Sequence, residues 1–256
     1  MSTGFYEDPA VFDILHASGT AAEVRGLERI ARLFCRRHGR GSTWLEPACG
    51  TGRYLRAAAR RGMNVIGFDL SPAMVRYAKE ACGRRPADGR ARFLVADMTR
   101  FAGRTGRVDF AFCPINTIRH LETDADMVRH LREVGRVLRP GAVYAVGLST
   151  TAYGVEAPAE DVWEGRRGAC HVKQIVEYLP PASPANRFEE VFSHLVITRG
   201  RREEHRDHAY RLRCYSMEQW SRVVRRGGLR IEAVTDDRGD PHSPGLFGYA
   251  VYILTR

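Results

Sequence analysis

The segment Trp44–Gly62 constrains the fold of this chain more than any other stretch. It has the pattern of a short apolar strand, a turn with two glycines and an amphipathic helix that ends at Gly62. Gly50 and Gly52 allow backbone conformations that a Cβ disfavours, and they let a ligand approach the main chain. In open α/β sheets, such a strand–turn–helix unit forms a nucleotide site at the carboxyl end of the strand. The segment therefore predicts an α/β fold with a ligand at this turn.

The turn itself, Glu46-Pro-Ala-Cys-Gly-Thr-Gly52, departs from the pattern that binds dinucleotides. That pattern, G-x-G-x-x-G, places a pyrophosphate over the start of the helix. Here an acidic residue opens the turn and a third glycine in register is missing. The Glu46 carboxylate would repel a pyrophosphate but attract a cationic ligand. A nicotinamide dehydrogenase is therefore disfavoured, and an ordinary tight turn is the remaining alternative.

Beyond Gly62, apolar strands alternate with amphipathic helices. This rhythm predicts a parallel sheet wound in the right-handed sense. A helix is also expected over residues 21–37, before the first strand. After the first strand, further strands are expected over residues 64–69, 92–96, 108–115, 142–148, 229–236 and 248–254.

The alternation breaks between residues 150 and 215. Three β-rich stretches lie there, over residues 171–179, 188–199 and 205–214, which suggests an antiparallel cap over the site or a dimer surface. The sequence therefore predicts four regions: an N-terminal helical lid (1–40), a ligand-binding core (41–150), the antiparallel cap (151–215) and a segment that completes the core (216–256). For the lid, plain packing on the sheet edge is the alternative.

Acidic residues follow the second and third predicted strands. Asp69 lies at the tip of the second strand, where an acid in this fold class grips the two hydroxyls of a ribose. Asp97 could accept the exocyclic amine of an adenine, and the Met98 backbone amide could bind a ring nitrogen. Leu70 and Met98 would sandwich the base. The alternative is that Asp69 and Asp97 only cap loops.

The composition limits the possible partners. A net charge of +10 and a pI near 9.7 allow a nucleic-acid partner, but the basic residues are nearly all arginines spread along the chain. Solvated surface is the preferred interpretation, followed by a basic pocket for a small anion. No apolar run approaches the ~20 residues of a membrane span, and no signal peptide is visible, so we expect a cytoplasmic protein without a membrane partner. The six cysteines are scattered singly, so we expect reduced thiols and no metal.

Four motifs together resemble those of class I methyltransferases, which use S-adenosylmethionine: Leu45–Gly52, Gly67–Ser71, Val95–Phe101 and Leu138–Gly141. Ala48 stands where the first glycine of the family motif is usual. The resemblance implies a seven-stranded, mostly parallel Rossmann-like sheet, S-adenosylmethionine as cofactor and S-adenosylhomocysteine as product. The cofactor-binding residues would be Tyr6, Glu46, Ala48, Gly50, Thr51, Gly52, Asp69, Leu70, Asp97, Met98 and Cys113.

More closely, the chain is similar to small-molecule enzymes such as the amino-sugar N,N-dimethyltransferases of macrolide biosynthesis. The similarity takes in Tyr6 with Phe12-Asp13, and the segments Asn116–Leu121, Phe192–Val196 and Pro244–Phe247. In that family the N-terminal segment closes over the cofactor. Phe12 stands where a tyrosine is usual, which leaves a hydroxyl contact from that position in doubt.

The resemblance implies methyl transfer to a small-molecule acceptor, with an amine nitrogen favoured over a hydroxyl. We expect His120, at the tip of the fourth strand, to act as a base or a substrate hydrogen-bond partner, a surface histidine being the alternative. Asn116, Arg119 and Tyr153 are candidate substrate-binding residues. A homodimer through the cap is a further hypothesis.

Two other functions stay open. An RNA or DNA methyltransferase is supported only by charge, because the fourth strand ends in Cys113-Pro-Ile-Asn rather than the Asn/Asp-Pro-Pro-aromatic pattern of amino-group base methylation. A non-catalytic S-adenosylmethionine-binding module is the other alternative.

Overall fold

The computed structural model describes residues 7–83 and 90–256, so Tyr6 lies outside the described residues. Its larger sheet has seven strands in the order β10-β11-β5-β4-β1-β2-β3. Strands β1 to β5 run parallel, while β11 is antiparallel to both β5 and β10. This confirms the expected seven-stranded, mostly parallel sheet. The bounds are β1 (Thr43–Pro47), β2 (Asn64–Asp69), β3 (Ala91–Val95), β4 (Val108–Cys113), β5 (Leu138–Thr150), β10 (Arg230–Thr235) and β11 (Gly248–Thr255).

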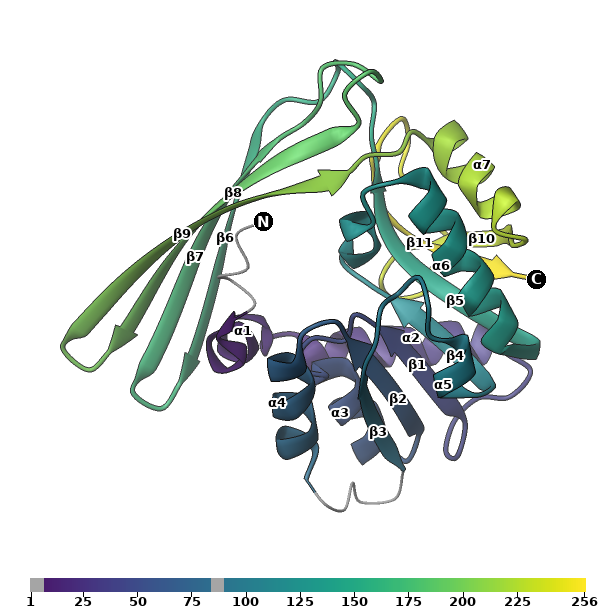
Figure 1. Ribbon diagram of the computed structural model, residues 1–256, viewed down its shortest axis with the longest axis horizontal. Coiled ribbons are helices and arrows are strands. Elements are labelled where there is room, and N and C mark those ends of the chain that lie inside the picture. The colour runs from purple at the N-terminus through teal and green to yellow at the C-terminus, as the bar shows by residue number, and fades with distance from the viewer. Residues whose placement is uncertain (1–6, 84–89) are drawn as a thin grey trace.

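Helices cover both faces of this sheet (Figure 1). One face packs against α2 (Thr20–Phe34), α3 (Arg53–Arg60) and α4 (Pro72–Cys82), and the other against α5 (Ala102–Thr105), α6 (Asp124–Val137) and α7 (Met217–Arg226). Both faces of the central strands are therefore buried, which explains why β4 is apolar except for Asp109. Full burial of each large apolar side chain contributes about 1.5–3 kcal/mol.

Local sequence signals fix the starts of two helices. Ser71 caps α4 by accepting a 3.3 Å hydrogen bond from the Met74 amide, with Pro72 at the first helical position. Ser216 and Gln219 form a capping box at the start of α7.

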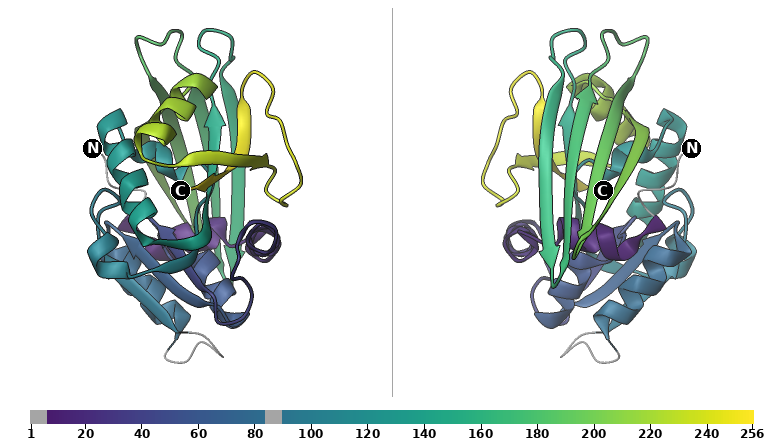
Figure 2. Two further views of the ribbon diagram at one scale, coloured as in Figure 1. Left: turned by 90° about the vertical axis from the view of Figure 1, so that its right-hand side faces the viewer. Right: turned by 90° about the vertical axis from the view of Figure 1, so that its left-hand side faces the viewer.

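The second sheet, here called the cap, is inserted after β5 and has four antiparallel strands in the order β6-β7-β8-β9 (Figure 2). They are β6 (Ala159–Arg167), β7 (Cys170–Leu179), β8 (Phe188–Arg199) and β9 (Arg202–Arg213). The two ends of the insertion lie side by side, because the Thr151 amide donates a 2.9 Å hydrogen bond to the Tyr215 carbonyl. Strand β6 was not among the three predicted stretches, since its residues are mostly exposed and lack an apolar alternation.

Several boundaries differ from the sequence-based expectation. Helix α2 ends at Phe34 rather than at residue 37, because Cys35 is extended and the Arg36 amide bonds to the Gly141 carbonyl at 2.8 Å. Strand β5 starts at Leu138, which pairs with Val108, rather than at residue 142. Two short elements complete the fold: α1 (Pro9–His16) and the 3-10 helix η2 (Thr117–His120).

None of the described helices combines the length and apolar character needed to cross a membrane.

Candidate active site

The turn after β1 is built from residues in the left-handed region. Ala48, Gly50 and Gly52 have φ values of 49°, 52° and 67°. Ala48 thus keeps a backbone conformation that glycine adopts more easily, at a steric cost from its Cβ. A Cβ on Gly52 would lie 2.8 Å from Cε1 of Phe93, so packing demands glycine there. A Cβ on Gly50 would lie 3.4 Å from Cε1 of Phe12, which places α1 against the turn.

Asp69, at the end of β2, is held against this turn. Its Oδ2 accepts a 2.8 Å hydrogen bond from the Gly50 amide, and its Oδ1 accepts a 2.9 Å bond from the Ser71 amide. Burial raises the pKa of Asp69, against the lowering effect of the backbone donors. The two carboxylate oxygens offer about four acceptor positions, more than these two amides occupy. Asp69 therefore keeps acceptor capacity toward a ligand.

Glu46 is a buried carboxylate behind the turn. It is 4% exposed, and its Oε2 has no hydrogen-bond partner among the described residues. Burial raises its pKa well above the usual range, although Arg53 opposes this. An unsatisfied buried carboxylate oxygen is costly unless a donor arrives. Glu46 therefore fits a ligand that carries an ammonium group at this turn.

The tips of β2 and β3 carry the predicted base-binding residues. Leu70 is 71% exposed, which is unusual for a large apolar side chain unless a ligand covers it. Asp97 is exposed, and its Oδ1 accepts hydrogen bonds from the Thr99 amide at 2.6 Å and hydroxyl at 2.8 Å. Asp97 thus caps its loop through Oδ1. Its Oδ2 accepts no hydrogen bond from another described residue. The Met98 carbonyl is held by His130 Nδ1 at 3.0 Å.

Two further predicted cofactor residues, Thr51 and Cys113, are buried. Burial raises the pKa of the Cys113 thiol to about 12, so this cysteine is protonated at neutral pH. A contact with a ligand would be apolar in character.

The loop after β4 is strained. Ile115 and Asn116 have φ values of 47° and 61°, and with Ala48 they are the non-glycine residues with positive φ within residues 7–83 and 90–256. All three lie beyond the ends of the adjacent strands β1 and β4. The Asn116 side chain fixes the loop, because it accepts from the Ser149 amide at 2.7 Å and donates to the Ser149 hydroxyl at 3.0 Å. Strain held in place this way is typical of functional sites.

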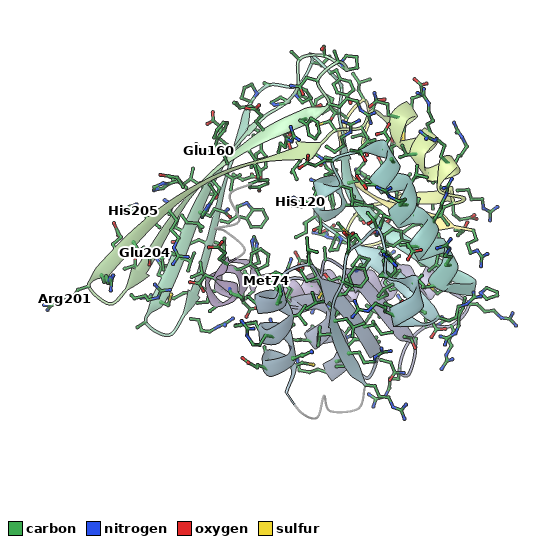
Figure 3. The ribbon with its side chains drawn as sticks, viewed as in Figure 1. Met74, His120, Glu160, Arg201, Glu204 and His205 are labelled. Carbon is green, nitrogen blue, oxygen red and sulfur yellow. The ribbon has the colours of Figure 1, made fainter. Side chains whose placement is uncertain are left out.

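His120 ends η2 on the core side of the interval between the two sheets (Figure 3). Its ring stacks on Tyr210 of β9, with centroids 5.7 Å apart and an interplanar angle of 29°. The His120 side chain keeps contact with solvent, but desolvation by its neighbours, followed by the nearby Arg119 charge, lowers its pKa to about 4. His120 is therefore a neutral imidazole at pH 7.

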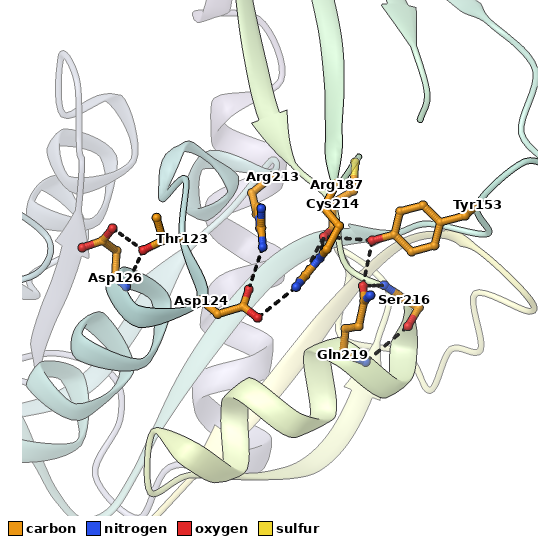
Figure 4. Close-up of polar contacts among 9 residues, drawn as sticks. All are labelled: Thr123, Asp124, Asp126, Tyr153, Arg187, Arg213, Cys214, Ser216 and Gln219. Atoms are coloured by element: carbon orange, nitrogen blue, oxygen red, sulfur yellow. Dashed lines mark hydrogen bonds and ion pairs between the residues drawn. The ribbon is translucent and has the colours of Figure 1, made fainter. Parts of the chain in front are cut away.

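Arg119 and Tyr153 are engaged within the protein. Arg119 pairs with Glu189 at 3.1 Å and donates to the Arg213 carbonyl at 2.9 Å. The Tyr153 hydroxyl lies 2.7 Å from Oε1 of Gln219, beside the junction of cap and core (Figure 4). These contacts hold the cap to the core, and the predicted contacts of Arg119 and Tyr153 with a substrate stay predictions.

The sequence analysis missed the role of Asp13. This α1 carboxylate is 1% exposed and binds Arg56 of α3, Arg167 of β6 at 2.7 Å and the Tyr77 hydroxyl of α4 at 3.0 Å. Burial alone would raise the pKa of Asp13, but Arg167 and Arg56 outweigh burial and lower it. Asp13 thus joins α1, the core and the cap. A lone acid in an amphipathic helix gives no sequence signal for partners so distant.

Fold and site together are those of an α/β protein in which the tips of β1, β2 and β3 fit a cationic nucleoside-type ligand. Residues 45–141 match the family model described as a methyltransferase domain. The chain is a class I S-adenosylmethionine-dependent methyltransferase.

Relatives of known name support this assignment. A dTDP-3-amino-3,6-dideoxy-alpha-D-glucopyranose N,N-dimethyltransferase of Streptomyces fradiae is 27% identical over 93% of this chain and 88% of that protein. The 27-O-demethylrifamycin SV methyltransferase of Amycolatopsis mediterranei is 27% identical over 68% of this chain and 61% of that protein.

Solved structures share the fold. An S-adenosylmethionine-dependent methyltransferase from Clostridium acetobutylicum superposes with a TM-score of 0.74 at 15% identity, covering 96% of both chains. The S-adenosylmethionine-bound amino pentose methyltransferase CalS10 from Micromonospora echinaspora gives 0.63 at 20% identity, over 93% of this chain and 92% of that one. S-adenosylmethionine is the methyl donor, and the unpartnered Glu46 oxygen beside the glycine turn fits its cationic amino-acid end.

Proposed function

We propose that this methyltransferase acts on an amine nitrogen of a small molecule, and that His120 binds the acceptor and takes its proton. When bound, S-adenosylmethionine supplies a methyl carbon that is already activated by a sulfonium. The remaining work of the protein is to hold the nucleophile in line with that carbon and to exclude water. Such positioning can lower a barrier by about 7–11 kcal/mol.

The cofactor contacts follow from the strand tips. We propose that Glu46 binds the amino group, that Asp69 binds the ribose hydroxyls, and that Leu70 and Met98 enclose the base. Gly50 and Thr51 would line the turn below the amino-acid end, and Asp97 would face the adenine amine. We also propose that Tyr6 and Cys113 contact the cofactor, because the family resemblance implies it.

The preference for a nitrogen over an oxygen acceptor rests on His120. Its lowered pKa, about 4, makes His120 a neutral hydrogen-bond acceptor that adds no positive charge beside a sulfonium. It also makes His120 a weak base. A neutral amine attacks through its lone pair and gives up a proton only after the new C–N bond has formed and the C–S bond of the sulfonium has broken, so a weak base suffices, whereas a hydroxyl must lose a far less acidic proton during attack. A weak base opposite Tyr210 therefore supports nitrogen.

The test compares wild type with His120→Asn on matched acceptors. Purified enzyme is given methyl-labelled S-adenosylmethionine and a panel of small amines and their hydroxyl analogues, and mass spectrometry locates the new methyl group. For the best amine we expect kcat to fall about 100-fold in His120→Asn, within the range attributed to general bases. His194→Asn, on the outer face of the cap, is the control and should keep full activity. Unchanged kcat and KM in His120→Asn would contradict the role of His120.

Methylation of oxygen is the second candidate, because the named relatives include both an N,N-dimethyltransferase and a methyltransferase whose name specifies a 27-O position. A labelled product that carries its methyl group on oxygen, across the whole panel, would favour it. We do not propose a nucleic-acid substrate, since many arginines pair with carboxylates, as Arg29 does with Asp240 at 2.5 Å.

We also propose that the cap contributes to a homodimer. Its outer face exposes Val162 and Phe192, which are 55% and 42% exposed. Light scattering should then give twice the mass of one chain, and Phe192→Glu should halve it.

A further inference from the structure

A row of aromatic rings runs from the cofactor turn to His120. It begins with Phe12 beside Gly50. The ring of Phe12 lies 4.4 Å from that of His16, and His16 lies 5.8 Å from Trp163 of β6. The Trp163 indole is within hydrogen-bonding reach of the Tyr178 hydroxyl.

The row continues across the cap to the other side of the site. Tyr178 and Tyr210 both pair with Val191 of β8, so they flank it on one face of the sheet. Tyr210 then stacks on His120. Aromatic side chains from α1, β6, β7 and β9 thus connect the turn below the cofactor with the proposed acceptor-binding histidine.

The pleat of the cap shows that this row lies on the face toward α1. Trp163 pairs with Gln174, and Gly165 pairs with Val172. A Cβ on Gly165 would lie 2.1 Å from the Ile14 carbonyl oxygen, so this face packs directly on α1. Asp161 has the same strand parity as Trp163 and Gly165, and therefore lies on the same face.

On this face of the cap, the charged side chain of β6 without an ion-pair partner among the described residues is an acid. The Asp161 carboxylate is exposed and forms no ion pair or hydrogen bond with another residue in the described part of the chain. Three arginines of the cap are already engaged: Arg167, on the same face of β6, with Asp13 at 2.7 Å, and on β9 Arg206 with Glu204 at 2.7 Å and Arg213 with Asp124 at 3.2 Å. A phosphorylated or otherwise anionic acceptor would find no spare guanidinium among these three, whereas a cation would find Asp161 and aromatic faces.

We propose that Asp161, Trp163 and Tyr178 bind the acceptor as an organic cation, an alkylammonium group. The proposal rests on the methyltransferase function above and adds the charge class of the acceptor. Aromatic faces attract a desolvated ammonium through their quadrupoles, and a nearby carboxylate adds direct attraction. On leaving this site the alkylammonium group would lose its proton to bulk water, and the neutral amine would then move along the aromatic side chains toward His120.

The tryptophans offer a selective readout. The sequence has three, of which Trp44 and Trp220 are 0% exposed and Trp163 is 40% exposed. Fluorescence changes caused by a polar solute therefore report on Trp163. The probes are choline and its neutral isostere 3,3-dimethylbutan-1-ol, which share one shape and differ in charge, with inorganic pyrophosphate as the anion.

Choline should give a saturable change in fluorescence, and the neutral isostere should bind about tenfold more weakly or less, a ratio in keeping with a desolvated cation–π contact. Pyrophosphate should not compete. Asp161→Asn should weaken choline binding several-fold, while Glu160→Gln, on the same strand and the opposite face, should not. Both positions are exposed, so neither change should disturb folding.

Equal binding of choline and its isostere, competition by pyrophosphate, or no saturable change would each overturn the cation site. Calorimetry with S-adenosylhomocysteine on the same samples separates this result from the proposed function. Choline binding without S-adenosylhomocysteine binding would support the cation site and contradict the proposed methyl transfer to an amine. The reverse pattern would overturn only the cation site.

Discussion

The Gly50 amide and the Asp69 carboxylate are joined by a 2.8 Å hydrogen bond, which locks the β1 turn to the tip of β2. One side chain thereby shapes the cofactor turn and faces the proposed ribose site. Asp69→Ala should therefore weaken S-adenosylhomocysteine binding about tenfold or more, as loss of a charged hydrogen-bond acceptor does. Ser71→Ala is the matched control, since it removes only the cap of α4 and should cost about 1 kcal/mol of stability with unchanged affinity. Titration calorimetry measures both, and unchanged affinity in Asp69→Ala would count against the assignment.

Glu46→Gln should affect stability and affinity in opposite directions. Burial raises the pKa of Glu46 well above normal, so the folded protein disfavours its charged form at pH 7. A neutral isostere removes that penalty, and the free protein should be as stable as wild type or more so. Affinity for S-adenosylhomocysteine should fall about tenfold or more, because the ammonium loses its carboxylate. Urea unfolding measures the stability of Glu46→Gln, and calorimetry measures its affinity for S-adenosylhomocysteine. A less stable variant with full affinity would refute the proposed contact.

Asp13→Asn should destabilise the protein by about 3 kcal/mol, since it leaves Arg56 and Arg167 without their carboxylate. The folded-state pKa of Asp13 is lowered, so its contribution is present above the unfolded pKa of about 3.9 and is lost as the pH falls through the lower folded value. The free energy of unfolding of Asp13→Asn should lack this decrease at low pH. Asp126→Asn, which breaks a surface pair with Arg129, should cost less than about 1 kcal/mol. Similar losses in both variants would contradict the central role of Asp13.

His130 predicts a second pH dependence. It is fully buried between the Met98 carbonyl and the Tyr144 hydroxyl, and burial lowers its pKa from 6.5 to about 4. Between these values the unfolded chain binds the proton that the folded protein rejects, so stability falls as the pH drops from 6.5 toward 4. A single such group contributes about 1.4 kcal/mol per pH unit. Between pH 4 and 6.5, the free energy of unfolding of His130→Gln should change less with pH than that of wild type. An equal slope in both proteins would show that His130 is not responsible.

Ala48→Gly should stabilise the protein, which is unusual for a change to glycine. Ala48 has φ 49°, where a Cβ costs about 1–2 kcal/mol, and the entropy lost by glycine offsets part of the gain. We expect a net gain of about 0.5–1 kcal/mol in the free energy of unfolding. Ala58→Gly, inside α3, should instead lose about 1 kcal/mol or more. A loss in both variants would show that Ala48 is not strained.

Local chemistry made much of the core predictable. The glycine turn before α3, the Ser71 and Ser216 caps and the apolar run of β4 each depend on neighbours within a few residues. Their order along the chain then implies the wound sheet, because parallel strands require crossover helices.

What could not be predicted depends on distant partners. Asp13 and Arg167 are 154 residues apart, and no local pattern pairs them. Strand β6 belongs to the cap through hydrogen bonds to β7, although its own residues are mostly exposed. The position of His120 after β4 was visible in the sequence, but its stacking partner Tyr210 comes from the far end of the cap.

The 2.9 Å bond between Thr151 and Tyr215 closes the insertion at its base, so the 63 intervening residues leave the core after β5 and return to it before α7 at one point. The insertion can be exchanged or lengthened by recombination without disturbing the register of the main-sheet strands, provided that the Asp13–Arg167 contact is kept. Swapping the insertion between homologous enzymes would therefore test whether it selects the acceptor, with the proposed donor site left unchanged.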